Sequence, residues 1–191
     1  MDQQHPSPSR WAIVLAGGEG TRMQPLVHRW LGFNRPKQYC AFVGSRSMFQ
    51  HTVDRAALVT APERIVAVVG RDHRDEILTQ LQGRTIGQVI YQPRNCETAA
   101  GLFLPLTYIH ARAPDATVVI FPSDHFIHPE DRFLAAVCRM AGLAETMPDR
   151  LVLLGIRPDR LEMEYGWILP GAALSSQEDA PLCEVHSFME K

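Results

Sequence analysis

The chain lacks most of the features that mark membrane, secreted and nucleic-acid-binding proteins. Its four cysteines are widely spaced and form no CxxC pair, which excludes a zinc-ligand pattern and a disulfide framework. No apolar run is long enough to cross a bilayer, and the first ten residues lack the apolar segment of a signal peptide. The formal net charge of −2 provides no general attraction to nucleic acid or anionic membranes. We therefore expect a cytoplasmic protein that binds anions only at a local site.

Lysine is also scarce. Only Lys37 and Lys191 are lysines among the 19 basic residues. A general preference for arginine accounts for that count by itself. A lysine is nevertheless a compact point charge, which an arginine does not always replace at a tight phosphate site. The two lysines are for this reason candidate phosphate ligands.

Short apolar runs alternate with helical patterns along the chain, which predicts an α/β fold with a mostly parallel sheet and helices on both faces. The predicted strands are residues 11–16, 64–69, 89–91, 117–121 and 151–156, with two more in GWILPG and VHSFMEK. The predicted helices are residues 47–59, 72–81 (capped by Asp72), 97–113 (interrupted by Pro105) and 133–146. We expect a disordered tail, residues 1–10, and one domain, residues 11–191.

The segment LAGGEGTRMQPL, residues 15–26, follows the first predicted strand and holds three glycines within four positions. Glycines permit close approaches of the backbone, and successive N–H groups of such a turn can bind an anion. The spacing matches neither a P-loop nor the dinucleotide-binding fingerprint. The glycines alone fit a tight turn and an anion site equally well. The nearby cations Arg22 and Lys37 favour the anion site.

Polar residues also follow the other predicted strands, and ligands of open α/β sheets bind beyond the carboxyl ends of the strands. Asp124, in FPSDHFIH, either hydrogen-bonds the following turn or holds Mg²⁺ beside a triphosphate. His125 and His128 lack a clear third metal ligand and are interpreted as structural. Asn95 and Thr98 either cap the next helix or reach a nucleoside.

The C-terminal part carries a further set of polar residues in EMEYGWI, which includes Glu162 and Gly166. A solvated loop is one interpretation, and a polar rim for sugar hydroxyls is the other. Glu190 and Lys191 end the sequence, where a frayed charged terminus is the default.

Six segments in order resemble the sugar-phosphate nucleotidyltransferases, and most closely the mannose-1-phosphate guanylyltransferases. They are LAGGEGTRMQPL, RPKQY, QPRNCETAA, FPSDHFI, LLGIRPDRLEMEYGWILPG and FMEK, and the resemblance spans residues 12–191. The resemblance implies a Rossmann-like nucleotide-binding domain that joins mannose 1-phosphate to GTP and releases pyrophosphate, with Mg²⁺ as cofactor. It leaves the oligomeric state open, with a homo-oligomer as one option.

The resemblance also implies a role for individual residues. Arg22 and Lys37 would be the catalytic cations that neutralise phosphates, and Asp124 would bind Mg²⁺. The nucleotide would contact Leu15, Ala16, Gly17, Gly18, Gly20, Thr21, Asn95 and Thr98. The sugar phosphate would contact Glu162, Gly166, Glu190 and Lys191.

The chain departs from the family pattern at several positions. Where the family usually has Asn-Arg-Gly-Thr, this chain has Asn95, Cys96, Glu97 and Thr98. Leu161 and Met163 stand where proline and threonine are common, and Glu164 where glycine is common. The family also continues beyond the FMEK segment with further strands and a second metal-binding aspartate, so we expect a domain that is incomplete at its C-terminus. The alternatives are another nucleotide and hexose pair, or a catalytically inactive nucleotide-binding fragment.

Overall fold

The computed structural model describes residues 10–95, 97–160, 162–163, 165–175 and 181–190. The chain divides into two compact units, residues 1–148 and 149–191. Of the predicted tail, only Arg10 is described, and it is the first residue of strand β1 (Arg10–Ala16); residues 1–9 lie outside the described part. The single domain over residues 11–191 stays a prediction. Within the described residues, no helix combines the length and the apolar character needed to span a membrane.

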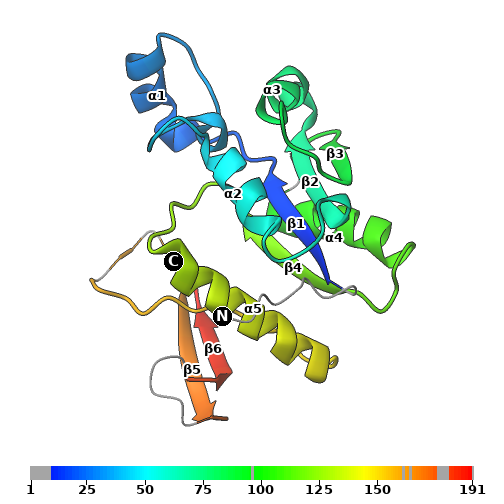
Figure 1. Ribbon diagram of the computed structural model, residues 1–191. Coiled ribbons are helices and arrows are strands. Elements are labelled where there is room, and N and C mark those ends of the chain that lie inside the picture. The colour runs from blue at the N-terminus through cyan, green and yellow to red at the C-terminus, as the bar shows by residue number, and fades with distance from the viewer. Residues whose placement is uncertain (1–9, 96, 161, 164, 176–180, 191) are drawn as a thin grey trace. The chain divides into compact units, whose positions relative to one another are not determined.

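A four-stranded parallel sheet forms the centre of the first unit (Figure 1). Its strands are β1, β2 (Ile65–Gly70), β3 (Gln88–Gln92) and β4 (Thr117–Pro122), in the order β3-β2-β1-β4. β1 pairs with β2 on one side and with β4 on the other. Chain order therefore reverses at β1, and in open α/β sheets such a reversal opens a crevice beyond the carboxyl ends of the strands. The predicted α/β fold is confirmed.

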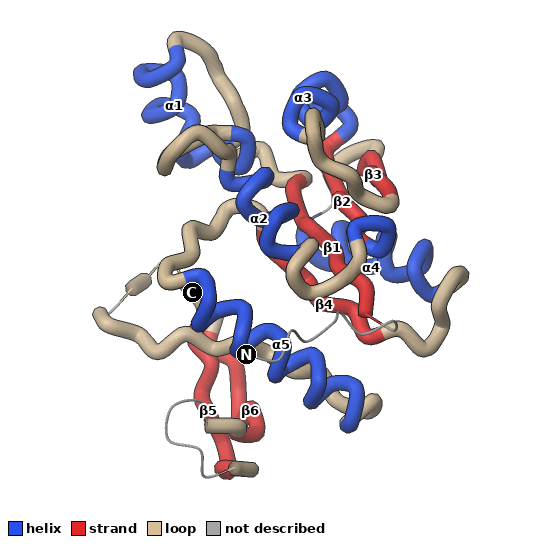
Figure 2. Tube along the Cα trace, in the orientation of Figure 1, coloured by secondary structure: helices blue, strands red, loops and turns tan. Residues whose placement is uncertain are grey.

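The helices that the structure describes in the first unit are drawn in blue in Figure 2. They are α1 (Gln24–Leu31), α2 (Met48–Ala56), α3 (Arg74–Gln80), α4 (Glu97–His110) and α5 (Glu130–Thr146). Short 3₁₀ turns lie at Thr21–Met23, Lys37–Tyr39, Pro62–Arg64 and Arg71–His73.

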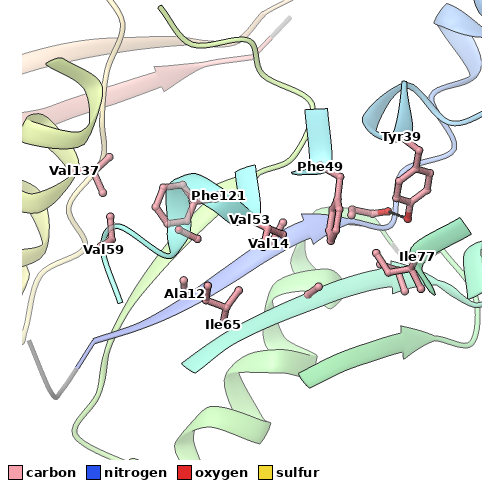
Figure 3. Packing of buried hydrophobic residues seen from close by; sticks show 14 residues of the cluster. Ala12, Val14, Tyr39, Phe49, Val53, Val59, Ile65, Ile77, Phe121 and Val137 are labelled. Atoms are coloured by element: carbon pink, nitrogen blue, oxygen red, sulfur yellow. Dashed lines mark hydrogen bonds between the residues drawn. The ribbon is translucent and has the colours of Figure 1, made fainter. Parts of the chain in front are cut away.

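Successive residues of the central strands point to opposite faces of the sheet and build two apolar clusters. On one face, Ala12 and Val14 of β1 pack with residues of α2, α3 and α5 (Figure 3). On the other face, Ile13 of β1 packs with Ile109 of α4. Because both faces are covered, residues 65–69 of β2 and residues 12–14 in the centre of β1 are buried.

Individual residues explain where α2 begins and why α4 continues past a proline. The Ser47 hydroxyl accepts from the N–H of Gln50 and the Gln50 side chain accepts from the N–H of Ser47, which is a capping box at the start of α2. α4 continues through Pro105 instead of being interrupted there. Gly101, Pro105 and Ile109 are its buried residues, and their spacing of four places them on one face, so packing of that face overrides the weak helix propensity of proline.

Asp72 is not the helix cap that the sequence predicted. It lies inside the 3₁₀ turn Arg71–His73, and α3 begins only at Arg74, with no side-chain hydrogen bond from its N-cap residue His73. The ring of His73 is buried and packs edge-on against Tyr39, which holds this residue at the start of α3.

The second unit contains the antiparallel pair β5 (Trp167–Ala173) and β6 (Cys183–Met189). Both strands were predicted. The predicted strand over residues 151–156 is wrong, because this segment has no regular secondary structure. Leu151 is 96% exposed and Ile156 is 80% exposed, so the apolar run buries little. An apolar segment becomes a strand only when a neighbouring strand pairs with its backbone groups.

Candidate functional site

A cavity of about 230 Å³ lies beyond the carboxyl ends of the parallel strands of the first unit. Eight residues that the sequence analysis assigned to the site line it: Leu15, Ala16, Gly17, Gly18, Lys37, Asn95, Thr98 and Asp124. They come from four separate segments, so the fold brings together residues that lie more than 100 positions apart. That the nucleotide contacts them remains a prediction.

Gln38 anchors the glycine loop through two hydrogen bonds. The Gln38 amide donates from Nε2 to the carbonyl oxygens of Ala16, at 2.9 Å, and of Gly18, at 2.8 Å. Gln38 is 2% exposed, so these hydrogen bonds are shielded from water. In a trans peptide the N–H points opposite to the C=O, so the N–H groups of Gly17 and Glu19 point away from Gln38. That the loop binds an anion on this side remains a prediction.

Tyr39 supports the same loop at the end of β1. Its hydroxyl donates to the carbonyl of Ala16 at 3.3 Å and lies 3.4 Å from Nδ1 of His73. Burial raises the pKa of Tyr39 far above its usual value, with Glu76 adding to the shift. The phenol therefore stays protonated and serves as a permanent donor to the loop.

Two of the three glycines are required by close contacts. A Cβ atom on Gly17 would collide with Oε1 of Gln92, whose side chain is 6% exposed. Gly20 has a φ of +63°, and a Cβ atom there would lie 3.1 Å from the backbone nitrogen of Lys37. Gly18 has nothing within 4 Å of its Cβ position, because it faces open space. Gly17 and Gly20 thus let the loop pack against Gln92 and Lys37.

Lys37 and Asp124 form an ion pair in the cavity wall. Nζ of Lys37 lies 2.7 Å from Oδ2 of Asp124, and the other carboxylate oxygen, Oδ1, lies 3.6 Å from Nε2 of His125. Both side chains of the pair are about one-third exposed, so a ligand in the cavity can reach them. The β4 end is fixed by Ser123, which donates from Oγ to the carbonyl of Leu15 at 2.6 Å.

The described residues of this cavity can hold a divalent cation only together with oxygen atoms of a bound ligand. Among the described residues, no group of three or more acidic, histidine or cysteine side chains could hold a metal. Asp124 is one carboxylate at the cavity wall. Mg²⁺ is commonly held by one or two carboxylates plus substrate phosphates rather than by a protein cage, so a single carboxylate facing a triphosphate suits it.

The remaining predicted residues of the first unit are not among the residues that line the cavity. Gly20 and Thr21 do not line it, and neither does Arg22, which is exposed within the 3₁₀ turn Thr21–Met23. The structure of the first unit therefore places Lys37, and not Arg22, in the cavity wall.

The β3–α4 loop forms another wall. The Asn95 carbonyl oxygen Oδ1 accepts from the backbone N–H of Glu97 at 3.0 Å, so Asn95 orders the start of α4. Glu97 and Thr98 line the cavity with it. Cys96 lies outside the described residues.

The residues predicted to bind the sugar phosphate belong to the second unit. Gly166 and Glu190 are neighbours there: a Cβ atom on Gly166 would lie 4.0 Å from Oε2 of Glu190. Glu162 lies 3.9 Å from Nε of Arg160. Lys191 lies outside the described residues. Their role in sugar binding remains a prediction.

A second cavity, of about 310 Å³, shares the Lys37–Asp124 pair with the first. Its other lining residues are apolar: Met23, Phe42, Val43, Met48 and Phe126. The ion pair therefore stands between a polar cavity and an apolar one.

Sequence reasoning missed Gln38, Gln92 and Ser123, which hold the loops in place. Gln38 directly follows Lys37, Ser123 directly precedes Asp124, and Gln92 is the first residue of the segment QPRNCETAA. A polar residue next to a candidate ligand was the available signal. Their partners are backbone carbonyls and a glycine, which no sequence pattern identifies.

Comparison with known protein families places the chain in context. A model of the nucleotidyl transferase family matches residues 11–191. The xanthan biosynthesis protein XanB of Xanthomonas campestris pv. campestris is 35% identical over 181 residues, covering 94% of this chain and 36% of the relative. A mannose-1-phosphate guanylyltransferase of Salmonella montevideo is 32% identical, covering 94% of this chain and 37% of the relative. The chain thus spans a little over one-third of the length of these relatives.

Solved structures share the fold. The crystal structure described as mannose-1-phosphate geranyltransferase from Thermus thermophilus superposes with a TM-score of 0.76 and 27% identity. The match covers 96% of this chain and 50% of that protein.

Proposed function

Because the chain belongs to the nucleotidyl transferase family, we propose that it transfers a nucleotidyl group from GTP to mannose 1-phosphate, giving GDP-mannose and pyrophosphate. The family match confirms the resemblance seen in the six sequence segments. The choice of these two substrates is supported by relatives named mannose-1-phosphate guanylyltransferase, among them the Salmonella montevideo protein. Since the chain spans 37% of that relative, the relative's activity is extended to this chain as a proposal.

The observation that supports this function best is the wall of the first cavity, where the glycine loop meets the Lys37–Asp124 pair. The loop offers backbone N–H groups, and Lys37 offers a positive charge. These are the donors that a triphosphate needs.

In this proposal the reaction is an in-line displacement. An oxygen of the sugar phosphate attacks the α-phosphorus of GTP, the bond to the β-phosphate oxygen breaks, and pyrophosphate leaves. No covalent protein intermediate is required, so the protein acts by positioning the two substrates and by offsetting negative charge. Gln38 and Tyr39 hold the loop rigid, and Lys37 moves from Asp124 to the phosphates. Arg22, in the 3₁₀ turn that follows the glycine loop, approaches the triphosphate from the same segment.

Mg²⁺, held by Asp124 together with the phosphates, would supply Lewis-acid stabilisation and orient the triphosphate. For the sugar phosphate we propose Glu162, Gly166, Glu190 and Lys191, on the basis of the family resemblance. We also propose a cytoplasmic location, where GTP is available, and we leave the oligomeric state open.

The decisive experiment incubates the 191-residue chain with GTP, Mg²⁺ and mannose 1-phosphate and measures pyrophosphate release. Release that depends on both substrates supports the proposal. Parallel reactions replace GTP by ATP, or mannose 1-phosphate by glucose 1-phosphate, and separate this substrate pair from others. Calorimetric titration with GTP measures binding independently of turnover.

The second candidate is a nucleotide-binding module without turnover. It is favoured by Glu97 in the cavity wall, because the family usually has a glycine at this position. GTP binding in the calorimeter without pyrophosphate release would support this candidate over the enzyme. Absence of both GTP binding and pyrophosphate release would exclude both candidate functions.

A further inference from the structure

Glu97 has an unusual backbone conformation in the wall of the first cavity. Its φ is +63°, the left-handed region that favours glycine, and it is the one described non-glycine residue with a positive φ. Its N–H donates to Oδ1 of Asn95, which helps to hold this conformation. Such a conformation costs free energy, and residues that retain it are concentrated at functional sites. The glutamate side chain is exposed and lines the cavity beside Thr98.

Glu97 is the second carboxylate of this cavity, and it differs from Asp124 in its partners. Asp124 is paired with Lys37, whereas no cation within the described part of the chain forms an ion pair with Glu97. An unpaired carboxylate repels a triphosphate that lies beside it. It is compatible with a bound nucleotide only where it faces hydrogen-bond donors.

The sheet order separates Glu97 from the phosphate end of the cavity. Glu97 follows β3 and Asp124 follows β4, which are the two outer strands of the four. Three strand spacings, about 14 Å, separate β3 from β4. With the triphosphate at the glycine loop and Lys37, the β3 side of the cavity is left for the base.

We propose that Glu97 selects guanine by accepting hydrogen bonds from N1–H and the 2-amino group of the base, an inference that rests on the nucleotide site proposed above. A carboxylate only accepts hydrogen bonds. Guanine presents two donors side by side on its pairing edge. Adenine and cytosine present one amino donor next to an acceptor nitrogen, and uracil presents one N–H between two carbonyls. Guanine alone satisfies both oxygens of Glu97, and charge-assisted pairs of this kind are strong.

The test is a set of binding constants for GTP, ITP and ATP, measured by calorimetry with the 191-residue chain. ITP keeps N1–H and lacks the 2-amino group, so its affinity is expected between those of GTP and ATP. Each lost hydrogen bond to the carboxylate is expected to weaken binding roughly tenfold. Equal affinities for all three triphosphates would overturn the role of Glu97 and leave the proposed function standing. Binding of none of them would overturn both.

Two variants test whether Glu97 itself selects the base. Glu97→Gln places one donor and one acceptor in the same position, which matches adenine, so the preference for GTP over ATP is expected to disappear or reverse. Glu97→Gly removes the carboxylate and suits the φ of +63°, so it is expected to fold normally and to bind GTP and ATP alike. Asp115→Asn removes an exposed acid that precedes the amino end of β4 and serves as the matched control. Retention of the full GTP preference by Glu97→Gln contradicts the proposal.

Discussion

Lys37 and Asp124 form an ion pair, with Nζ of Lys37 2.7 Å from Oδ2 of Asp124. The sequence predicted different partners for them, phosphate for Lys37 and Mg²⁺ for Asp124. Under the proposed function, a triphosphate would compete with Asp124 for Lys37, and a cation would compete with Lys37 for Asp124. We therefore expect nucleotide binding and metal binding to be coupled through this pair.

Asp124→Asn should uncouple GTP binding from Mg²⁺ binding. The substitution removes one negative charge from the cavity wall and releases Lys37, so GTP should bind about two- to fivefold more tightly without Mg²⁺, as a part-exposed ion pair contributes at most about 1 kcal/mol. The enhancement of GTP affinity by Mg²⁺ should disappear with the carboxylate. Calorimetric titrations with and without Mg²⁺ measure both effects.

Lys37→Ala is the companion variant. It should weaken GTP binding in both conditions, because it removes the cation and leaves the carboxylate in the cavity. Asp115→Asn should change neither measurement. An Asp124→Asn protein that keeps the Mg²⁺ enhancement would exclude Asp124 as the metal ligand.

Gln38→Leu should destabilise the protein and loosen the glycine loop. The leucine has a similar volume but leaves the buried carbonyls of Ala16 and Gly18 without their amide donor. The expected loss is about 1 to 3 kcal/mol in the free energy of unfolding, together with weaker GTP binding. Urea denaturation measures the first effect and calorimetry the second. The control is Gln82→Leu at an exposed glutamine, for which neither value should change appreciably.

Gly17→Ala and Gly18→Ala should differ sharply in stability. The first places a Cβ atom against Oε1 of the buried Gln92 side chain and should cost about 1 to 3 kcal/mol. The second meets nothing within 4 Å and should stay within about 0.5 kcal/mol of the parent protein. Adding Gln92→Ala to Gly17→Ala should recover part of the loss. Additive effects of Gly17→Ala and Gln92→Ala would show that the two residues do not interact.

Asp54 should make folding stability depend on pH in the acid range. Burial alone would raise the pKa of Asp54, but hydrogen bonds from Arg84 (2.7 and 2.9 Å) and Arg46 (2.8 Å) outweigh it and hold the pKa below its usual value. The stabilisation is therefore present above roughly pH 4, the unfolded pKa, and is lost as the pH falls through the lower folded-state pKa. Urea denaturation of the parent and Asp54→Asn proteins should show a constant difference above about pH 5 that shrinks below pH 4. A difference that grows on acidification would contradict this assignment.

The sequence determined most of the fold through patterns that act locally. The apolar runs around Ile13 and Val66 could be recognised as buried strands, since a strand covered on both faces needs no alternation. The segment 151–156 has the same composition and is not a strand, because strand formation depends on a neighbour to share hydrogen bonds. The length of α4 across Pro105 was likewise decided by packing.

For the candidate site, the sequence by itself determined the chemistry of the residues and the tertiary structure decided which of them meet. The glycines, Lys37, Asn95 and Asp124 were recognisable from their residue types and from their places after predicted strands. The order β3-β2-β1-β4 then brought them to one cavity, left Arg22 out of its lining, and paired Lys37 with Asp124. The contact of Gln92 with Gly17 and the positive φ of Glu97 also appeared only in three dimensions. These relationships depend on distances between segments far apart in the chain, and residue types and spacing do not encode such distances.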